Sequence, residues 1–310
     1  GSGHSDVGGA TTVNYIKRAF HSIVAAEDHA DDTGYLGTSD LVTDGYQLNL
    51  ACYADGVDAS QDFAATWSGV TIDGWTTGPV NYIRIYTPVG PSEVGRSQRH
   101  TGVAGTGYVY RPLINGGAVY WCILVYNTEE YVRIEGIEID GASTTSTGIL
   151  YGLYSDTDDH MASDIRFDSV IVHALTNGTV DNDGDNVAYM VGIAGRNGNY
   201  RISNSLVYDI ENRFTTGPAT SITGIYAYQS ECQFYYYNNT VYDVKYTGGF
   251  AGSSARGISN LGGTVYAKNN YVGNLAASGA GSTATCYVNT FTTGSTNNAS
   301  SDATDRKSVV

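Results

Sequence analysis

The sequence predicts an all-β protein built as a solenoid of parallel coils with three short strands per coil, and two repeating patterns predict it. Polar residues recur at one place in a repeated segment, at Glu135, Asp168, Asn204, Asn238 and Asn269. A glycine-isoleucine dipeptide recurs between these segments, at Gly148-Ile149, Gly192-Ile193, Gly224-Ile225 and Gly257-Ile258. Fixed periods of about 20–50 residues are typical of solenoids and related repeat architectures.

The polar positions predict a corner between two strands of each coil. Five segments align without gaps: Tyr131–Asp140, Asp164–His173, Tyr200–Asp209, Phe234–Asp243 and Val265–Asn274. In each, β-branched and aromatic residues flank two adjacent small or polar residues, as expected for short strands joined by a tight turn. The glycine-isoleucine stretch supplies the third strand. Such short strands enclose an interior only when like strands stack about 4.8 Å apart.

The earlier part of the chain contains weaker versions of the same pattern. Four apolar stretches predict further coils: Leu48–Tyr53, Val70–Ile72, Tyr82–Tyr86 and Val119–Tyr126. Between Thr87 and Pro112 the apolar pattern lapses, which predicts a long loop. We therefore expect the parallel β-helix to occupy residues 35–289.

The two ends of the chain have different patterns. We expect an extended or disordered segment over 1–12 and a capping α-helix within 13–34, because one apolar stripe has helical spacing. The stripe consists of Tyr15, Ile16, Ala19, Phe20, Ile23 and Val24. A helix there would cover the first open strand edge. Residues 290–310 predict an irregular tail. Its last six residues, 305–310, match the translation of a sequencing adapter, so our hypothesis is a gene cut short at its 3′ end.

Composition excludes two classes of partner. The chain has 16 basic and 31 acidic residues and a net charge of −15, which opposes a broad phosphate-binding surface, so we expect no nucleic acid partner. No apolar run approaches the roughly 18 residues that a membrane span needs, so we expect no membrane insertion. The four cysteines lie far apart in apolar stretches, which predicts buried, unpaired thiols.

With these strands, the Asn-Asn corners and the helix, the chain resembles right-handed, single-stranded parallel β-helix proteins of the pectin-lyase-like group over Val13–Val288. It looks most like uncharacterised β-helix repeat proteins of phages and environmental bacteria, in stretches such as Asp40–Gly45 and Tyr131–Asp140. The resemblance implies a polysaccharide ligand and an extracellular or virion-associated location. It also implies that function lies on the outer face of the glycine-isoleucine strand.

Two acidic loops are candidate sites. Asp181, Asp183 and Asp185 alternate around a glycine, and their hard oxygen ligands suit Ca²⁺, although the spacing is not that of an EF-hand. A glycoside hydrolase needs two carboxylates about 5–9.5 Å apart. Asp156, Asp158 and Asp159 could supply such a pair. The hydrolases that the chain resembles carry Gly-His-Gly-like and Arg-x-Lys elements that this sequence lacks. The alternative for both loops is a solvated turn.

A third candidate follows from strand alternation. If Ile193 points inward, Ala194 and Arg196 point outward, and the same register on the next coil sends Tyr226 and Tyr228 outward. Arg196 and the tyrosines could then form a lyase site, a carbohydrate-binding surface or an ordinary stack of exposed side chains.

Other charged residues receive structural interpretations. Arg133 and Arg166 share a repeat column, and we expect them to pair with Glu135 and Asp168 across coils. His173 has no evident partner in the sequence, so we assign it no role.

The sequence favours a polysaccharide-binding β-helix, like a phage tailspike shaft or an adhesin. One alternative is a polysaccharide lyase or glycoside hydrolase that uses Arg196 and the aspartates of the two acidic loops. Another is a structural subunit that forms a homo-oligomer, either a trimer or an end-to-end stack.

Overall fold

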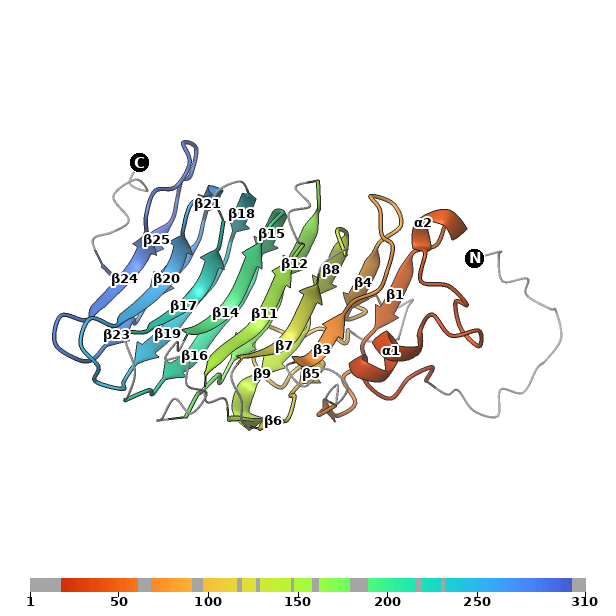
Figure 1. Ribbon diagram of the computed structural model, residues 1–310, viewed down its shortest axis with the longest axis horizontal. Helices are drawn as coiled ribbons and strands as arrows, with labels where there is room; N and C mark the ends of the chain where they lie inside the picture. Colours follow the sequence, from red (N-terminus) through yellow and green to blue (C-terminus); the bar gives the residue numbers. More distant parts are fainter. Residues whose placement is uncertain are drawn as a thin grey trace.

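In the computed structural model, the chain forms a parallel β-solenoid of about 6 turns, which confirms the predicted fold class. Three parallel sheets run along the long axis (Figure 1). The structure describes residues 18–60, 68–90, 97–115, 119–126, 129–145, 148–157, 162–178, 189–215, 219–229 and 232–302. Neither helix in these ranges is long enough to cross a membrane.

Each coil contributes one strand to each sheet. Sheet I contains, in spatial order, β1 (Leu48–Ala51), β4 (Ile83–Tyr86), β8 (Val132–Glu135), β12 (Ile165–Asp168), β15 (Asn199–Ser203), β18 (Gln233–Tyr237) and β21 (Thr264–Lys268). Sheet II contains β3 (Ser68–Ile72), β7 (Val119–Tyr126), β11 (Ile149–Asp156), β14 (Tyr189–Arg196), β17 (Ser221–Ala227), β20 (Ser254–Asn260) and β24 (Thr283–Val288).

The third sheet closes the coil. Sheet III contains β2 (Val57–Asp58), β5 (Val109–Tyr110), β9 (Glu138–Asp140), β13 (Ile171–His173), β16 (Leu206–Asn212), β19 (Thr240–Tyr246), β22 (Tyr271–Gly273) and β25 (Ala299–Ser300), and β23 (Ala276–Ala277) also pairs with β19. A two-stranded sheet joins β6 (Ile114–Asn115) and β10 (Thr144–Thr145), and a 3-10 helix spans Gly141–Ser143.

Like residues stack on like residues in the interior. In sheet I the inward column is formed by Ile85, Ile134, Phe167, Ile202 and Tyr236, and all five are buried. Their outward neighbours in β4, β8 and β12 are only partly buried, which is the alternation expected of a sheet with one face on a core. Each coil therefore covers the apolar side chains of its neighbours.

The corner between sheets I and III has a left-handed backbone conformation. The residues that adopt it show that the predicted alignment needs a correction. The corner column has positive φ and contains Gly136, Ser169, Asn204, Asn238 and Asn269. Asp168 pairs with Ser203 rather than with Asn204. The gapless alignment is therefore wrong by one residue between the second and third segments, because Glu135 and Asp168 resemble asparagine chemically but precede the turn.

Asparagine side chains continue the hydrogen bonding of the backbone behind this corner. Asn270 Oδ1 accepts from the backbone N–H of Asn239 at 3.0 Å, and Asn298 Oδ1 accepts from that of Asn270 at 3.1 Å. The amide groups of Asn239 and Asn270 also donate to buried carbonyl oxygens one coil back. This ladder gives partners to polar groups that would otherwise be costly to bury.

The recurring glycine is required by packing across the interior, and its first member differs from our prediction. The structural column is Gly152, Gly192, Gly224 and Gly257, so Gly148-Ile149 does not belong to it. A Cβ at Gly192 would lie 2.4 Å from Val207 Cγ1 and 2.7 Å from the carbonyl oxygen of Gly224. The glycine column therefore lets sheet II approach the valines of sheet III.

The N-terminal helix is shorter than the predicted range. Helix α1 spans Ile23–His29, and residues 18–22 are not helical. The helix begins where it does because the Ser22 side chain accepts a hydrogen bond from the Ala25 N–H, which is an N-cap interaction. Ile23, Val24 and Ala26 pack into the core beside β3. A second short helix, α2, spans Leu41–Asp44.

Two irregular predictions also differ from the structure. The predicted loop over Thr87–Pro112 contains strand β5. The described part of the predicted tail over 290–310 follows the coil path, since β25 pairs with β22. All four cysteines are free and buried, as predicted.

We predict that Gly192→Ala lowers the free energy of unfolding by about 1–3 kcal/mol, the usual cost of overpacking a core. The added methyl group would overlap Val207 and the next coil. Gly56→Ala is the matched control, because nothing lies within 4 Å of a Cβ at that position. Chemical denaturation of both variants checks this, and equal stability would contradict the packing role of the glycine column.

The capping helix gives a prediction about pH. Burial raises the pKa of Glu27 from 4.5 to about 7. Hydrogen bonds from the Asp73 N–H and Trp75 Nε1 act to lower this pKa, but burial outweighs them. The folded state therefore favours the protonated acid, and this contribution to stability is lost as pH rises through about 7. Glu27→Gln should stabilise the protein by about 2 kcal/mol at pH 8 and by less than about 1 kcal/mol at pH 5. Thermal unfolding at both pH values measures the difference, and a pH-independent effect would contradict it.

Candidate functional site

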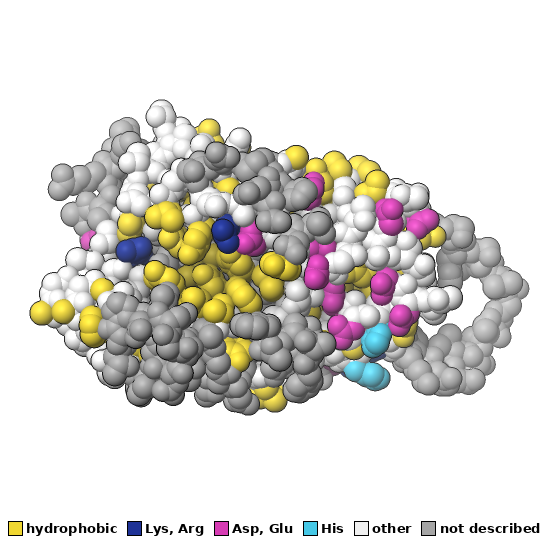
Figure 2. Space-filling model, in the orientation of Figure 1, with side chains coloured by type: hydrophobic (Ala, Val, Ile, Leu, Met, Phe, Trp, Pro, Cys, Tyr) yellow, Lys and Arg dark blue, Asp and Glu magenta, His cyan; other side chains and the backbone are white. Residues whose placement is uncertain are grey.

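The outer face of sheet II carries a cluster of aromatic side chains. We call Trp121, Tyr151, Tyr154, Tyr226 and Tyr228 the aromatic patch. Figure 2 shows hydrophobic side chains gathered over the middle strands of this sheet, with basic side chains at the margin. The patch lies outside the coil, so its rings add nothing to the interior. Aromatic rings gathered on an outer face are a candidate recognition surface.

Strand register brings the rings together. Trp121 of β7 pairs with Tyr151 of β11, and their ring centroids lie 6.3 Å apart. Tyr151 and Tyr154 lie on the same face of β11, with centroids 4.7 Å apart. Two coils beyond β11, Tyr226 lies 4.8 Å from Tyr228. The patch therefore reaches from β7 to the end of β17, and between β11 and β17 the strand β14 contributes the small side chains of Val191 and Ala194.

Arg196 lies at the edge of the patch, on the outer face predicted for it. Its Nη1 is 3.2 Å from Asp156 Oδ2, and its Cζ is 5.9 Å from the ring centroid of Tyr228. Asp156 also accepts hydrogen bonds from Tyr154 at 3.3 Å and from Asn197 at 2.9 Å. The structure thus brings Arg196, Tyr226 and Tyr228 together and adds Asp156 to them, while Ala194 is buried beneath the rings.

The titratable groups of the patch keep their protons. Burial raises the pKa values of Tyr151, Tyr154, Tyr226 and Tyr228. For Arg196, burial acts to lower the pKa, but the Asp156 carboxylate and the Tyr154 phenol outweigh it, so the net shift is upward. Tyr151 and Tyr154 are buried, so the surface presents the neutral phenols of Tyr226 and Tyr228 and the charged guanidinium of Arg196, which are hydrogen-bond donors rather than proton acceptors.

Sequence reasoning missed half of this site. Tyr154 lies on the same outward row as Ala194 and Tyr226, whereas Trp121 and Tyr151 lie on the neighbouring outward row of Val191. The signal was present in the alternation of β7 and β11, but the incorrect placement of Gly148-Ile149 in the glycine column obscured it. Asp158, Asp159, Asp181, Asp183 and Asp185 lie outside the described residues, so the hydrolase pair and the Ca²⁺ loop remain predictions.

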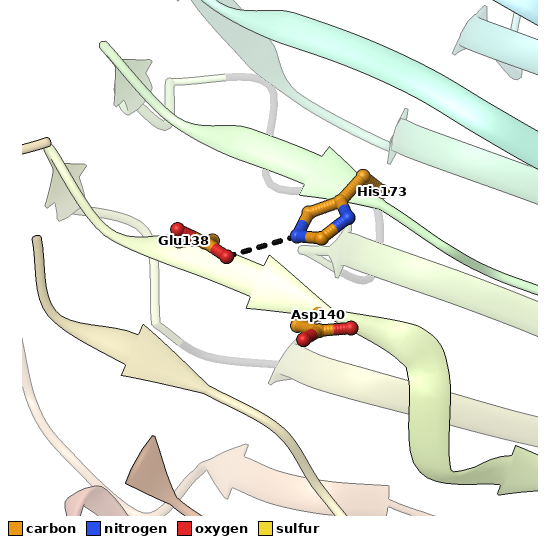
Figure 3. A group of neighbouring side chains, drawn as sticks. All are labelled: Glu138, Asp140 and His173. Carbon is orange, nitrogen blue, oxygen red and sulfur yellow. Dashed lines mark hydrogen bonds and ion pairs between the residues drawn. The ribbon is translucent and has the colours of Figure 1, made fainter. Parts of the chain in front are cut away.

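A second cluster lies on the outer face of sheet III. Glu138 and Asp140 of β9 and His173 of β13 place ligand atoms within 4.8 Å of one another (Figure 3). His173 Nε2 lies 2.9 Å from Glu138 Oε1, and Glu138 Oε2 accepts from the Gly105 N–H at 2.6 Å. Arg111 donates twice to Asp140 Oδ2, at 2.5 and 2.8 Å.

These partners fit a structural role for the cluster better than a metal site. Asp140 is 4% exposed and Glu138 2% exposed, and such buried carboxylates need compensation. The Arg111 guanidinium already neutralises the Asp140 carboxylate that a cation would need as a ligand. The pairing of Asp140 with His173 follows from the repeat alignment, but Arg111 and Gly105 come from the segment that we took for a loop.

The predicted arginine pairs on sheet I are wrong. Glu135 receives its ion pair from Arg84, at 2.6 Å, and Arg133 lies over the ring of Tyr82. Arg166 pairs with Asp164 of its own coil. Each predicted partner instead forms an ion pair with another neighbour: Glu135 with Arg84 of the preceding coil, and Arg166 with Asp164 of its own coil.

Comparison with protein-family models, with curated proteins and with solved structures found no match for this chain. The family resemblance stated above therefore stays a prediction. What the structure establishes is the parallel β-solenoid with three sheets.

We predict that Arg111→Gln lowers the free energy of unfolding by about 2–3 kcal/mol, since it leaves the buried Asp140 carboxylate without its cation. The matched control is Arg213→Gln, because the partner of Arg213, Glu211, is on the surface and such pairs contribute less than about 1 kcal/mol. Urea unfolding at pH 7 compares the two variants. Equal losses would show that the sheet III cluster is not held by Arg111.

Proposed function

We propose that this chain binds polysaccharide through the aromatic patch. The observation that carries the proposal is a set of aromatic rings on β7, on β11 and at the end of β17 of sheet II, with the Arg196–Asp156 pair at its edge. Sugar rings have apolar faces and polar rims. A surface that combines flat aromatic area with hydrogen-bonding groups matches both parts.

The length of the patch favours a polymer over a single sugar. Neighbouring coils repeat about every 4.8 Å, so Trp121 of β7 and Tyr226 of β17, which are three coils apart, lie roughly 15 Å from each other along the solenoid axis. Tyr226 and Tyr228 are half-buried, which holds the rings in place while leaving contact area. Rings that are already ordered lose little conformational entropy when a ligand binds.

Protonation favours binding over catalysis by these residues. A polysaccharide lyase needs a base that can take a proton near neutral pH. The pKa values of Tyr226, Tyr228 and Arg196 are raised, so these groups stay protonated near neutral pH and cannot take up a proton from the substrate. We therefore assign Arg196 to ligand contact. A lyase or hydrolase would have to draw its base from the acidic loops.

We further propose an extracellular or virion-associated setting for this binding, as in the pectin-lyase-like group that the sequence resembles. A solenoid with outward binding rows suits a shaft or an adhesin, because the rows run along its length. Assembly into a trimer or an end-to-end stack would multiply weak contacts with a polymer.

Affinity gel electrophoresis against a panel of neutral and acidic polysaccharides tests the binding. We predict that Tyr226→Ala combined with Tyr228→Ala weakens retardation at least about tenfold, the usual scale for losing two central aromatic contacts. The control combines Tyr242→Ala with Tyr271→Ala, which removes two exposed tyrosines from sheet III. Loss of binding in the control as well, or no retardation of the unmodified protein by any polysaccharide, would refute the proposal.

The enzymatic alternative has a separate readout. Absorbance near 235 nm reveals the unsaturated product of a lyase, and a reducing-sugar assay reveals hydrolysis. We expect both assays to stay at background with polysaccharides that bind. Turnover that is abolished by Arg196→Gln would contradict the assignment of Arg196 to binding alone.

A further inference from the structure

The outer face of sheet I carries a row of arginines that none of the roles above uses. In strand register, Arg84 of β4 pairs with Arg133 of β8, Arg133 with Arg166 of β12, and Arg166 with Arg201 of β15. We call these four residues the arginine ladder. Arg201 then pairs with Tyr235 of β18, and Tyr235 with Tyr266 of β21, so aromatic rings extend the ladder.

Only alternate members of the ladder are neutralised. Arg84 forms an ion pair with Glu135 at 2.6 Å, and Arg166 forms one with Asp164. Within the described part of the chain, Arg133 and Arg201 form no ion pair; each lies over a tyrosine ring, with Cζ 3.5 Å from the Tyr82 centroid and 5.6 Å from that of Tyr235. Like charges opposite one another on neighbouring strands repel, and the carboxylates of Glu135 and Asp164 neutralise only two of the four arginines, so the ladder keeps a net positive charge.

A face with more basic than acidic residues is unusual for a chain with a net charge of −15. The strands of sheet I contain five basic residues, the arginine ladder and Lys268, against the two acidic residues Glu135 and Asp168. Arg201 is exposed and Arg133 is partly exposed, so both side chains are in contact with solvent. A guanidinium that is ordered by an aromatic ring is well suited to bind a carboxylate or sulfate in bidentate fashion.

The spacing points to a repeating ligand. Arg133 and Arg201 are two coils apart, which is roughly 10 Å along the solenoid axis. In an extended polysaccharide with two-fold symmetry, every second sugar presents the same edge, so one acidic group per disaccharide would face the ladder. Tyr235 and Tyr266 are stacked with centroids 5.2 Å apart, and they offer apolar area to the next sugar rings.

We propose that the arginine ladder is a second binding site, specific for an acidic polysaccharide aligned with the solenoid axis. Arg133 and Arg201 bind its carboxylate or sulfate groups, and Tyr235 and Tyr266 contact its sugar rings. The site lies on sheet I, whereas the aromatic patch lies on sheet II, so it does not depend on the function proposed above.

Isothermal titration with hyaluronan, alginate and chondroitin sulfate tests the site in the full chain. We expect at least one of them to bind with an affinity that falls as salt rises. Arg133→Gln combined with Arg201→Gln should weaken that binding at least about tenfold, the scale of losing charge-assisted hydrogen bonds. The matched control, Arg213→Gln with Lys245→Gln, removes the same charge from β19 of sheet III and from the residue that follows β16, and it should change affinity less than about twofold.

Further variants separate this site from its alternatives. Arg201→Gln alone removes an exposed side chain and supports the proposal if it weakens binding without lowering the melting temperature. The Tyr226→Ala and Tyr228→Ala pair should keep salt-dependent binding of the acidic polymer, even if the aromatic patch fails to bind anything. The proposal is overturned if none of the three polymers binds, if the control loses as much affinity as the ladder variant, or if a single-stranded DNA oligonucleotide binds as tightly.

Discussion

The structure depends on the in-register stacking of parallel coils. Because each strand pairs with its equivalent one coil away, every sequence position becomes a column along the solenoid axis. The main inward columns are hydrophobic, as in the row from Ile85 to Tyr236. Corner columns need left-handed backbone, and the asparagine ladder behind them gives partners to buried polar groups. A slip of one residue would send the apolar side chains outward, so register is the constraint on which the other features rest.

The same stacking creates the candidate surfaces. Outward columns are free of the packing requirement, so a chemical type can repeat there without disturbing the core. On sheet II the repeat is aromatic, with Arg196 and Asp156 at its edge. On sheet I the repeat is cationic, in a chain that is otherwise strongly acidic. Two faces of one solenoid can therefore present different chemistry to polymers that run in the same direction.

The sequence predicted the coil architecture because corner residues and strand residues differ sharply in type. The predicted register was wrong where residues of similar type occupy different positions. Glu135 and Asp168 resemble the corner asparagines but precede the turn, and Gly148-Ile149 has the same two residues as the glycine column but does not belong to it. Contacts between the repeated segments and the rest of the chain could not be predicted from the repeat. An example is the pair of Asp140 with Arg111, because Arg111 lies outside the aligned segments. The alternation of side chains along a strand was enough to predict that Arg196 and Tyr228 point outward. That Trp121 lies near them could not be predicted without the register of the earlier coils.

The most direct test of this account is a disulfide between neighbouring strands of sheet II. Ala194 and Tyr226 are Cα partners on β14 and β17, so cysteines at these two positions should cross-link on mild oxidation, because parallel neighbours lie within the roughly 4.4–6.8 Å that a disulfide spans. Cysteines at Ala194 and Tyr228 share the outer face but lie two residues out of register, and they should stay reduced. Peptide mapping by mass spectrometry distinguishes the pairs. Cross-linking of the second pair in preference to the first would contradict the register on which both proposed surfaces rest.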